Sequence, residues 1–350
     1  MHFASDNTAP VPPQVLDALT RANHGHAPPY GTDATSAEAA DRIRRMLEAP
    51  DAAVCMVPTG TAANALALAT LAPPWGQIFC HHHAHIEEDE CGAPEFYTGG
   101  AKLTVLDGPA GRITPATLDG ALAGAGAMGV HNVQPAAVSL TNVTERGAVY
   151  APGEIAALSA VARAHDVPVH LDGARLANAL AATGASPAEM TWKAGVDALS
   201  LGATKNGLMA AEAVVLFDPA RAGELAFRRK RAGQLFSKQR YLAAQLLAWL
   251  EDDLWMHLAR RANAAAARLA DGLAAIEGAT LHHEVGANMI FADLPRAALR
   301  RLSEAGAQFN LIEPGARLSG PDHSALAVRL VTSWATTDAE IDRFLEVAAA

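Results

Sequence analysis

Short apolar segments alternate with helical patterns between residues 50 and 217. The first segment, 52–57, leads into an Ala/Leu-rich stretch at 60–72 that predicts a helix, and 152–166 predicts another. The remaining apolar segments are 77–81, 101–107, 136–141, 167–172, 196–202 and 211–217. Strands separated by helices at this spacing are typical of a mostly parallel sheet covered on both faces. This part of the chain is therefore predicted to have an α/β fold.

The pattern changes after residue 217. Residues 241–276 are almost all helix formers, with no glycine or proline before Gly272, and predict a long connecting helix. Strand-like segments follow at 281–285, 287–294 and 325–333, with helical patterns at 295–305 and 337–349. We expect a large domain over residues 21–245 and a smaller C-terminal α+β domain over residues 246–350. The cleft between them is the natural place for a ligand.

The chain has 350 residues, of which 50% are hydrophobic, and a formal net charge of −10. This charge argues against nucleic-acid binding, and the basic run at 228–231 is more typical of a solvated helix face or a small-anion site. No apolar stretch has the length of a membrane span, and the N-terminus lacks the pattern of a secretory signal. Cys55, Cys80 and Cys91 form no CxxC pair, which favours buried thiols in a cytoplasmic protein.

Two polar groups stand at the ends of predicted strands. Asp172 ends one strand, in the motif HLDGAR, and Lys205 follows the next one, in the motif SLGATKNG. In open α/β sheets, ligands bind beyond the carboxyl ends of the strands. A buried lysine there favours the neutral amine that attacks an aldehyde. Taken singly, Asp172 could instead cap a helix, and Lys205 could simply pair with Asp172.

A third motif, PTGTAANAL at 58–66, sets Gly60 and Thr61 after a strand and at the start of a helix. Free N–H groups and the helix dipole attract a phosphate there, although Thr61 could merely cap the helix. The fingerprint GxxxxGK[ST] is absent, and the GxGxxG match at 124–129, GAGAMG, does not directly follow a predicted strand, so ATP and NAD sites are not indicated. A lysine, a carboxylate and a helix N-terminus together meet the needs of pyridoxal 5′-phosphate (PLP) for its aldehyde, ring nitrogen and phosphate.

Longer segments carry a family resemblance over essentially the whole chain. In order they are FASDN, NHGHAPPYGTD, TGTAANALALA, AHIEEDECGAPEF, LDGARLANA, TWKAGVDALSLGATKNG, AEAVVLF and RKRAGQLFSKQR. The chain resembles the low-specificity L-threonine aldolases, in the β-eliminating lyase branch of the fold-type I PLP enzymes. The resemblance implies a large PLP-binding domain, a small C-terminal domain and an N-terminal segment, 1–20, that contributes to the active site. It also implies a homotetramer, or at least a homodimer with shared active sites.

The resemblance assigns a role to each candidate site residue. It implies that Lys205 forms the Schiff base with PLP, that Asp172 binds the pyridine nitrogen and that His85 stacks on the ring. Gly60 and Thr61 would bind the phosphate. The other implied binding residues are Arg175 for the cofactor hydroxyl or the substrate carboxylate, Ser5 and Arg329 for the α-carboxylate, and Tyr30 and Lys238 for a site across a subunit interface. Arg329 could also be a satisfied charge on an edge strand.

One segment departs from the family pattern. Many members carry a second histidine in a segment similar to ENTHNG, whereas this chain has TNVTERG at 141–147. Thr144 or its neighbours occupy the place of that histidine. The base for the substrate hydroxyl is therefore open between His85 and a water that His85 and nearby polar groups hold.

The implied reaction is the reversible cleavage of L-threonine, L-allo-threonine and related β-hydroxy-α-amino acids to glycine and an aldehyde. Alternatives that use the same cofactor are a phenylserine-preferring aldolase, a β-eliminating lyase and a transaminase. A non-catalytic scaffold would not need Lys205, Asp172 and Arg329. The histidine-rich segment at 81–90 suggests a metal site at first sight, but consecutive strand residues point to opposite faces, so we expect no metal there.

Overall fold

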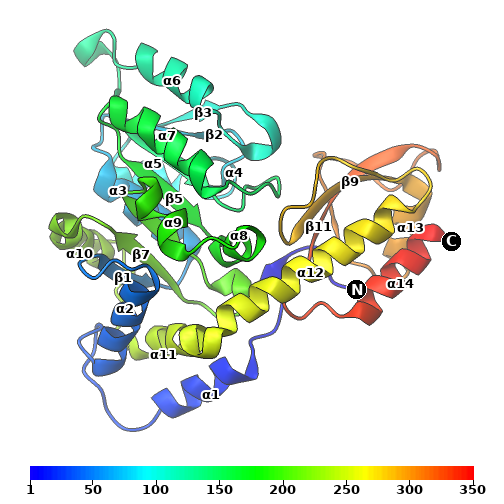
Figure 1. The fold of residues 1–350 in the computed structure, drawn as a ribbon, viewed down its shortest axis with the longest axis horizontal. Coiled ribbons are helices and arrows are strands. Elements are labelled where there is room, and N and C mark those ends of the chain that lie inside the picture. The colour runs from blue at the N-terminus through cyan, green and yellow to red at the C-terminus, as the bar shows by residue number, and fades with distance from the viewer.

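The computed structural model describes residues 1–350, and its larger sheet has seven strands (Figure 1). They are β1 (Ala53–Val57), β2 (Gly76–His81), β3 (Lys102–Leu106), β4 (Gln134–Thr141), β5 (Val169–Gly173), β6 (Ala198–Leu201) and β7 (Glu212–Leu216). Their order is β1-β7-β6-β5-β4-β2-β3, and all neighbouring pairs are parallel except the two that include β7. The predicted strands and the mostly parallel α/β sheet are confirmed.

Helices bury both faces of this sheet. Successive residues of β7 divide between two apolar clusters, with Ala213 and Val215 in one and Val214 and Leu216 in the other, because strand side chains alternate between the faces. The first cluster includes residues of α2 (Ala34–Met46), α6 (Pro115–Gly124), α7 (Pro152–Ala164), α8 (Leu176–Thr183) and α11 (Arg240–Leu250). The second includes residues of α3 (Gly60–Leu71) and α10 (Ala222–Arg231). Such burial on both faces explains why the strands are apolar throughout.

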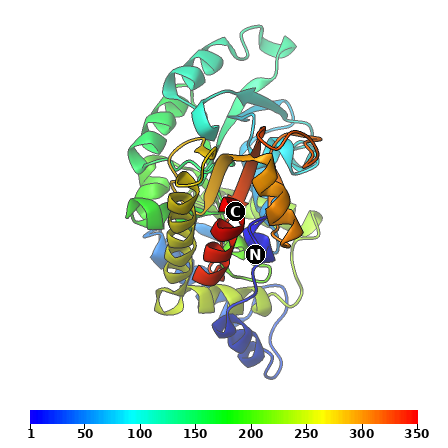
Figure 2. The same cartoon turned by 90° about the vertical axis from the view of Figure 1, so that its right-hand side faces the viewer.

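The smaller sheet is antiparallel and belongs to the C-terminal part. Its strands, in spatial order, are β10 (Asn310–Leu311), β11 (Ala325–Val331), β9 (Met289–Pro295) and β8 (Thr280–Leu281). Its helices are α13 (Arg296–Glu304) and α14 (Asp338–Ala349), close to their predicted positions. The strand predicted at 281–285 is wrong in extent, because β8 has only two residues. Figure 2 faces this part of the molecule and shows both chain termini there.

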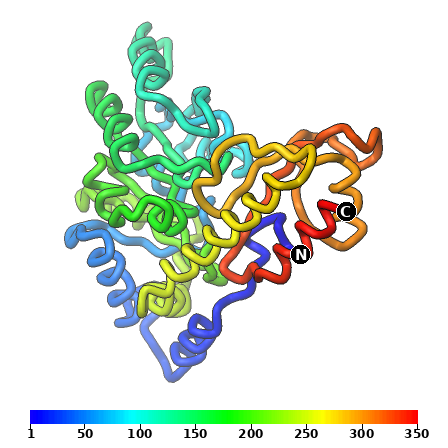
Figure 3. Tube along the Cα trace, turned by 45° about the vertical axis from the view of Figure 1, so that its right-hand side comes forward, coloured from blue at the N-terminus to red at the C-terminus, as the bar shows by residue number.

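The first residues of the chain join the smaller sheet. Phe3 donates its N–H to Gln308 O and accepts the N–H of Val331, both at 2.8 Å, and its buried ring packs edge-on against Phe344. Figure 3 shows this N-terminal segment alongside the C-terminal helices before it leads back to the larger part. Residues just after Phe3 are thereby held where the two sheets approach each other.

The long helix predicted at 241–276 is interrupted. The chain instead forms α11, a short turn at Glu251–Asp253 and then α12 (Leu254–Ala274), the diagonal helix of Figure 1. Asp252 and Asp253 have positive φ values of 49° and 57°. Aspartate tolerates this left-handed conformation better than most residues, so the helix breaks without glycine or proline. The prediction of one continuous helix is wrong for this reason.

Candidate active site

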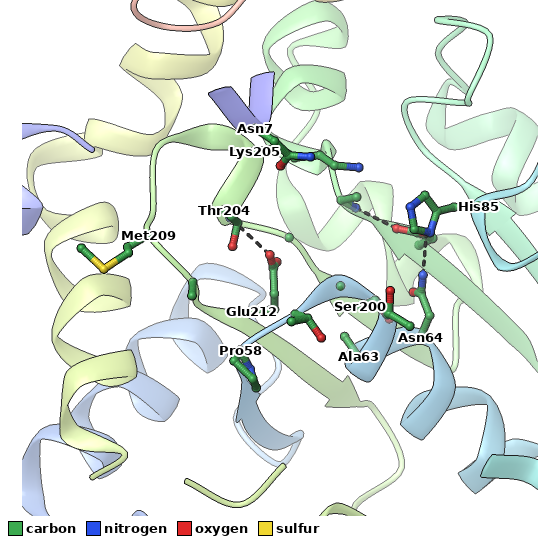
Figure 4. A pocket seen from close by; sticks show the side chains of 17 residues that line it. Asn7, Pro58, Ala63, Asn64, His85, Ser200, Thr204, Lys205, Met209 and Glu212 are labelled. Atoms are coloured by element: carbon green, nitrogen blue, oxygen red, sulfur yellow. Dashed lines mark hydrogen bonds between the residues drawn. The ribbon is translucent and has the colours of Figure 1, made fainter. Parts of the chain in front are cut away.

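A cavity of about 340 Å³ opens beside the carboxyl ends of the central strands (Figure 4). The strand register places Thr141, Asp172 and Ser200 next to one another at this edge. The lining includes five of the predicted site residues, namely Gly60, Thr61, His85, Asp172 and Lys205. It also includes residues that were not predicted, among them Asn7, Asn64, Ser200, Thr204, Met209 and Glu212. Parallel strands end at the same edge, which is why residues far apart in sequence meet here.

The carboxylate of Asp172 is fixed by two donors. Its Oδ1 accepts the N–H of Ala174 at 2.9 Å, and its Oδ2 accepts the side-chain amide of Asn64 at 2.8 Å. Asp172 is 3% exposed, so water competes little for these hydrogen bonds. The Asp172 carboxylate is therefore held in a defined position in the lining of the cavity.

His85 is positioned by a buried glutamate. Its Nδ1 lies 2.7 Å from Glu90 Oε1, and the same oxygen accepts the second amide hydrogen bond of Asn64 at 2.8 Å. The hydrogen bond to Glu90 raises the pKa of His85 above its usual value, and burial raises the pKa of Glu90. Asn64 thus connects the partner of His85 to Asp172. Neither Asn64 nor Glu90 was predicted as a site residue.

Lys205 follows β6 in a short turn whose backbone is held by Glu212. The N–H groups of Ala203 and Thr204 donate to the Glu212 carboxylate at 2.8 and 3.4 Å. The Lys205 amine itself makes no hydrogen bond or ion pair with the protein, and Figure 4 shows its side chain free among the lining residues. Glu212 therefore holds the turn, while the Lys205 amine stays available to a ligand.

Glu212 should make the stability of the cofactor-free protein depend on pH. Burial raises its pKa from 4.5 to about 7, so the folded state retains a proton that the unfolded state releases. This contribution to stability is complete below pH 4.5 and is lost as the pH rises to about 7. It amounts to at most about 3 kcal/mol. Denaturant unfolding of Glu212→Gln across this range should show a flatter pH dependence than the wild type. The control Glu304→Gln, at an exposed glutamate, should keep the pH dependence of the wild type. Equal slopes of stability against pH for Glu212→Gln and the wild type would contradict the prediction.

The N-terminus of α3 presents free backbone donors to the cavity. The Thr59 side chain caps the helix by accepting the N–H of Ala62 at 3.1 Å, whereas the N–H groups of Gly60 and Thr61 have no partner within the protein. Apart from Gly60, its chain neighbours and the backbone of its own helix, no atom lies within 4 Å of the point where a Cβ of Gly60 would stand, so a ligand can approach the backbone closely. Uncapped N–H groups and the helix dipole make this a suitable phosphate site.

Two predicted arginines lie near the cavity without lining it. Buried Arg175 donates to Asp6 through Nε and Nη2 at 2.7 and 3.0 Å. Burial opposes ionisation of Asp6, yet the charge of Arg175 lowers the pKa of Asp6 below its usual value. Arg329, on β11, has a buried Nε without a partner and only a long contact of 3.5 Å from Nη2 to Ala4 O. Arg329 therefore retains donors for an incoming carboxylate.

The remaining predicted residues lie outside the cavity of this chain. The Ser5 hydroxyl accepts the N–H of Asn7 at 3.2 Å. Asn7 lines the cavity, whereas Ser5 does not. Tyr30 and Lys238 are exposed and lie in adjoining segments, since the N–H of Tyr30 donates to Ser237 O at 2.9 Å. The structure thus brings these two segments together on the surface, and neither residue lines the cavity that contains Lys205.

The histidine-rich segment has protein partners. His82 pairs with Asp107 at 2.6 Å, and His83 contacts Glu88 at 2.9 Å and Arg146 at 2.7 Å. No three His, Cys, Asp or Glu side chains converge as metal ligands. No helix combines the length and apolar character that crossing a membrane requires.

Comparison with known proteins places this geometry in a family. The model of the beta-eliminating lyase family matches residues 2–295. The low specificity L-threonine aldolase of Pseudomonas aeruginosa is 41% identical over 99% of this chain and 95% of its own. The chain belongs to the beta-eliminating lyase family. The resemblance inferred from its motifs is therefore confirmed.

Two further similarities extend this assignment. The low specificity L-threonine aldolase of Pseudomonas sp. is 40% identical over 97% of this chain and 94% of its own. The threonine aldolase of Leishmania major superposes with a TM-score of 0.91 at 31% identity, covering 99% of this chain and 98% of that one. A serine palmitoyltransferase of Sphingomonas wittichii shares the fold, with a TM-score of 0.69 at 16% identity. This lyase-family chain therefore keeps the fold of its relatives over its full length.

Proposed function

We propose that this lyase-family protein is a PLP-dependent aldolase that cleaves L-threonine, L-allo-threonine and related β-hydroxy-α-amino acids to glycine and an aldehyde. The observation that carries the proposal is the unpartnered amine of Lys205 in one cavity with the fixed carboxylate of Asp172 and His85. The names of the aldolases from Pseudomonas and Leishmania support the same activity.

The residues of the cavity fit PLP. The free N–H groups of Gly60 and Thr61 suit its phosphate, and the Lys205 amine suits its aldehyde. When bound, PLP supplies an electron sink for the pair released at the substrate Cα. In this proposal Asp172 keeps the pyridine nitrogen protonated and His85 covers the ring.

Other residues orient the substrate. The unpaired Nε of Arg329 suits the α-carboxylate, with Ser5 nearby in the N-terminal segment. Burial and the like charge of Arg175 lower the pKa of Arg329, so a bound carboxylate would be a favourable partner for it. Holding the carboxylate fixes the Cα–Cβ bond relative to the ring, which selects the bond that breaks.

The activity test uses purified protein with added PLP. Mixing with L-threonine should release equal amounts of acetaldehyde and glycine. Phenylserine should be run in parallel, because release of benzaldehyde at a higher kcat/KM would favour the phenylserine-preferring alternative. Formation of a keto acid without acetaldehyde would instead indicate elimination or transamination.

We further propose a homotetramer in which a second copy completes each active site. The surface position of Tyr30 and Lys238, in adjoining segments, supports this arrangement. We also place the protein in the cytoplasm, in agreement with its three free cysteines, of which Cys80 is buried whereas Cys91 is exposed rather than buried as expected.

Mixing inactive variants tests the shared site. Refolding Lys205→Ala subunits with Lys238→Ala subunits should restore up to about a quarter of the wild-type activity, because half of the subunit pairs are mixed and each mixed pair contains one intact site. Each variant alone should stay inactive, and sedimentation should give the mass of four chains. Monomers with full activity would contradict the proposal.

A further inference from the structure

The turn after β4 brings a glutamate to the edge of the site. Thr141 lies opposite Asp172 in the strand register, and the N–H of Asn142 donates to Asp172 O at 3.0 Å. The turn is then closed by the N–H of Thr144, which donates to Ala148 O at 2.9 Å. Glu145 is the next residue, so it is held within a fixed turn beside the strand that carries Asp172.

The carboxylate of Glu145 has no partner in the protein. It makes no hydrogen bond and no ion pair, and the residue is only partly exposed. It lines a small cavity of about 10 Å³ together with His83 and Tyr150, which is room for about one water molecule. A partly exposed carboxylate without a donor from the protein is free to accept a proton or a hydrogen bond from a ligand.

The charged groups that act on Glu145 are residues of the candidate active site or its surroundings. Burial raises the pKa of Glu145 above its usual value, against the opposing effect of Lys205 and Arg175. Asp172 and His85 also influence its ionisation, and Glu145 in turn influences that of Arg329. Thr141 pairs with Asp172, and Glu145 shares a small cavity with Ala84, the neighbour of His85, so Glu145 borders the groups proposed to bind the cofactor rather than lining their cavity.

The other candidates for a base have contacts or roles of their own. The Thr144 hydroxyl donates to Ala110 O at 2.8 Å and accepts the N–H of Ala148 at 3.0 Å, so it stabilises the turn. His85 lies 2.7 Å from Glu90 Oε1 through Nδ1, which leaves its Nε2 without a partner, but in the proposed site this imidazole covers the cofactor ring. Among residues 141–147, Glu145 is the carboxylate without a partner.

We propose that Glu145 is the general base that removes the proton of the substrate β-hydroxyl. This inference rests on the proposed aldolase function. Glu145 takes the hydroxyl proton as the C–O bond becomes C=O, and the Cα–Cβ bond breaks with its electron pair left on Cα. Cα then takes up one proton, so the products are an aldehyde and glycine and no oxidant or reductant is needed. Glu145 thus supplies the base that remained open after the second histidine of the family pattern was found to be missing.

The test separates the cleavage step from chemistry that needs no hydroxyl base. In Glu145→Gln with PLP bound, kcat for L-threonine cleavage should fall by about 10²- to 10⁴-fold. Exchange of the α-proton of glycine in deuterated water, followed by NMR, should stay within about threefold of the wild type, because glycine has no β-hydroxyl. The cofactor absorption spectrum should also be unchanged. Glu145→Asp, which retains a carboxylate, should recover part of the cleavage rate.

The pH profile gives a second readout. Cleavage by the wild type should decline as the pH falls through the raised pKa of Glu145, since only the carboxylate form accepts a proton. This acid limb should be missing in Glu145→Gln. The matched control is Glu87→Gln, at an exposed glutamate on the nearby helix α4 (His85–Glu88), which should behave like the wild type.

Two results would overturn the role of Glu145. Cleavage by Glu145→Gln at nearly the wild-type rate would exclude it as the base while leaving the aldolase function intact. An equal loss of cleavage and of glycine exchange would indicate a structural role instead. If the wild type itself releases no aldehyde, the aldolase function fails, and the proposal for Glu145 fails with it.

Discussion

Lys205→Ala should abolish L-threonine cleavage, with kcat at least about 10⁴-fold below the wild type, while the protein stays folded. Lys205 is the only lysine that lines the cavity, so no other amine can replace it. Its amine makes no hydrogen bond or ion pair, and its removal therefore breaks no contact that stabilises the fold. Steady-state release of acetaldehyde measures the first expectation, and the denaturant midpoint of unfolding measures the second.

A covalent readout makes the Lys205 experiment independent of activity. Borohydride reduction followed by mass spectrometry should place the cofactor on the peptide that contains Lys205 in the wild type and on no peptide in Lys205→Ala. Lys102→Ala, at an exposed lysine of β3, is the matched control and should retain both the label and the rate. Glycine formed at full speed by Lys205→Ala would contradict the proposed function itself.

The large domain and the centre of the site could be predicted because their signals are local. Apolar segments between helices predict parallel strands, and parallel strands bring their carboxyl ends to one edge, so Asp172 and Lys205 had to lie close together. Gly60 and Thr61 followed from the same pattern, since they come directly after β1 and begin α3. These inferences needed only the order of the elements.

The supporting residues could not be predicted because they act across long stretches of sequence. Asn64 bonds to Asp172 from 108 positions away, and nothing in the Ala/Leu-rich pattern of α3 shows which face of that buried helix points to the site. Glu212 appears in an apolar strand segment, where its role becomes evident only when the turn of Lys205 is seen to donate to it. The segment that contains Glu145 departs from the family pattern, but the sequence does not show where the Glu145 carboxylate lies.

The helix break at Glu251–Asp253 shows a different limit. Helix propensity describes an isolated stretch, whereas here α11 packs against the larger domain and α12 runs toward the smaller sheet. Buried Trp249 and Trp255, on either side of the turn, have ring centroids 5.2 Å apart. Tertiary packing thus outweighs a propensity that differs by only about 0.7 kcal/mol per residue among ordinary residues.

Asp172→Asn should lower kcat for L-threonine cleavage by about 10³-fold, with a loss of stability of about 1 kcal/mol. The amide keeps an oxygen that can accept the N–H of Ala174, but its NH2 group then faces the donating amide of Asn64, so one hydrogen bond is lost. It lacks the negative charge that would keep the pyridine nitrogen protonated, and without that proton the ring is a poorer acceptor for the electron pair at Cα. The loss should therefore appear in kcat more than in KM.

Three measurements separate this electrostatic role from a structural one. Cleavage kinetics give kcat and KM, unfolding in denaturant gives the stability, and titration with PLP gives the affinity for the cofactor. Asp271→Asn makes the same chemical change at an exposed position of α12 and should leave all three unchanged. Because Asn64 joins Asp172 to the Glu90–His85 pair, the substitution should also shift the pH dependence of cleavage. If Asp172→Asn keeps the wild-type kcat, the charge of this carboxylate does not serve the reaction.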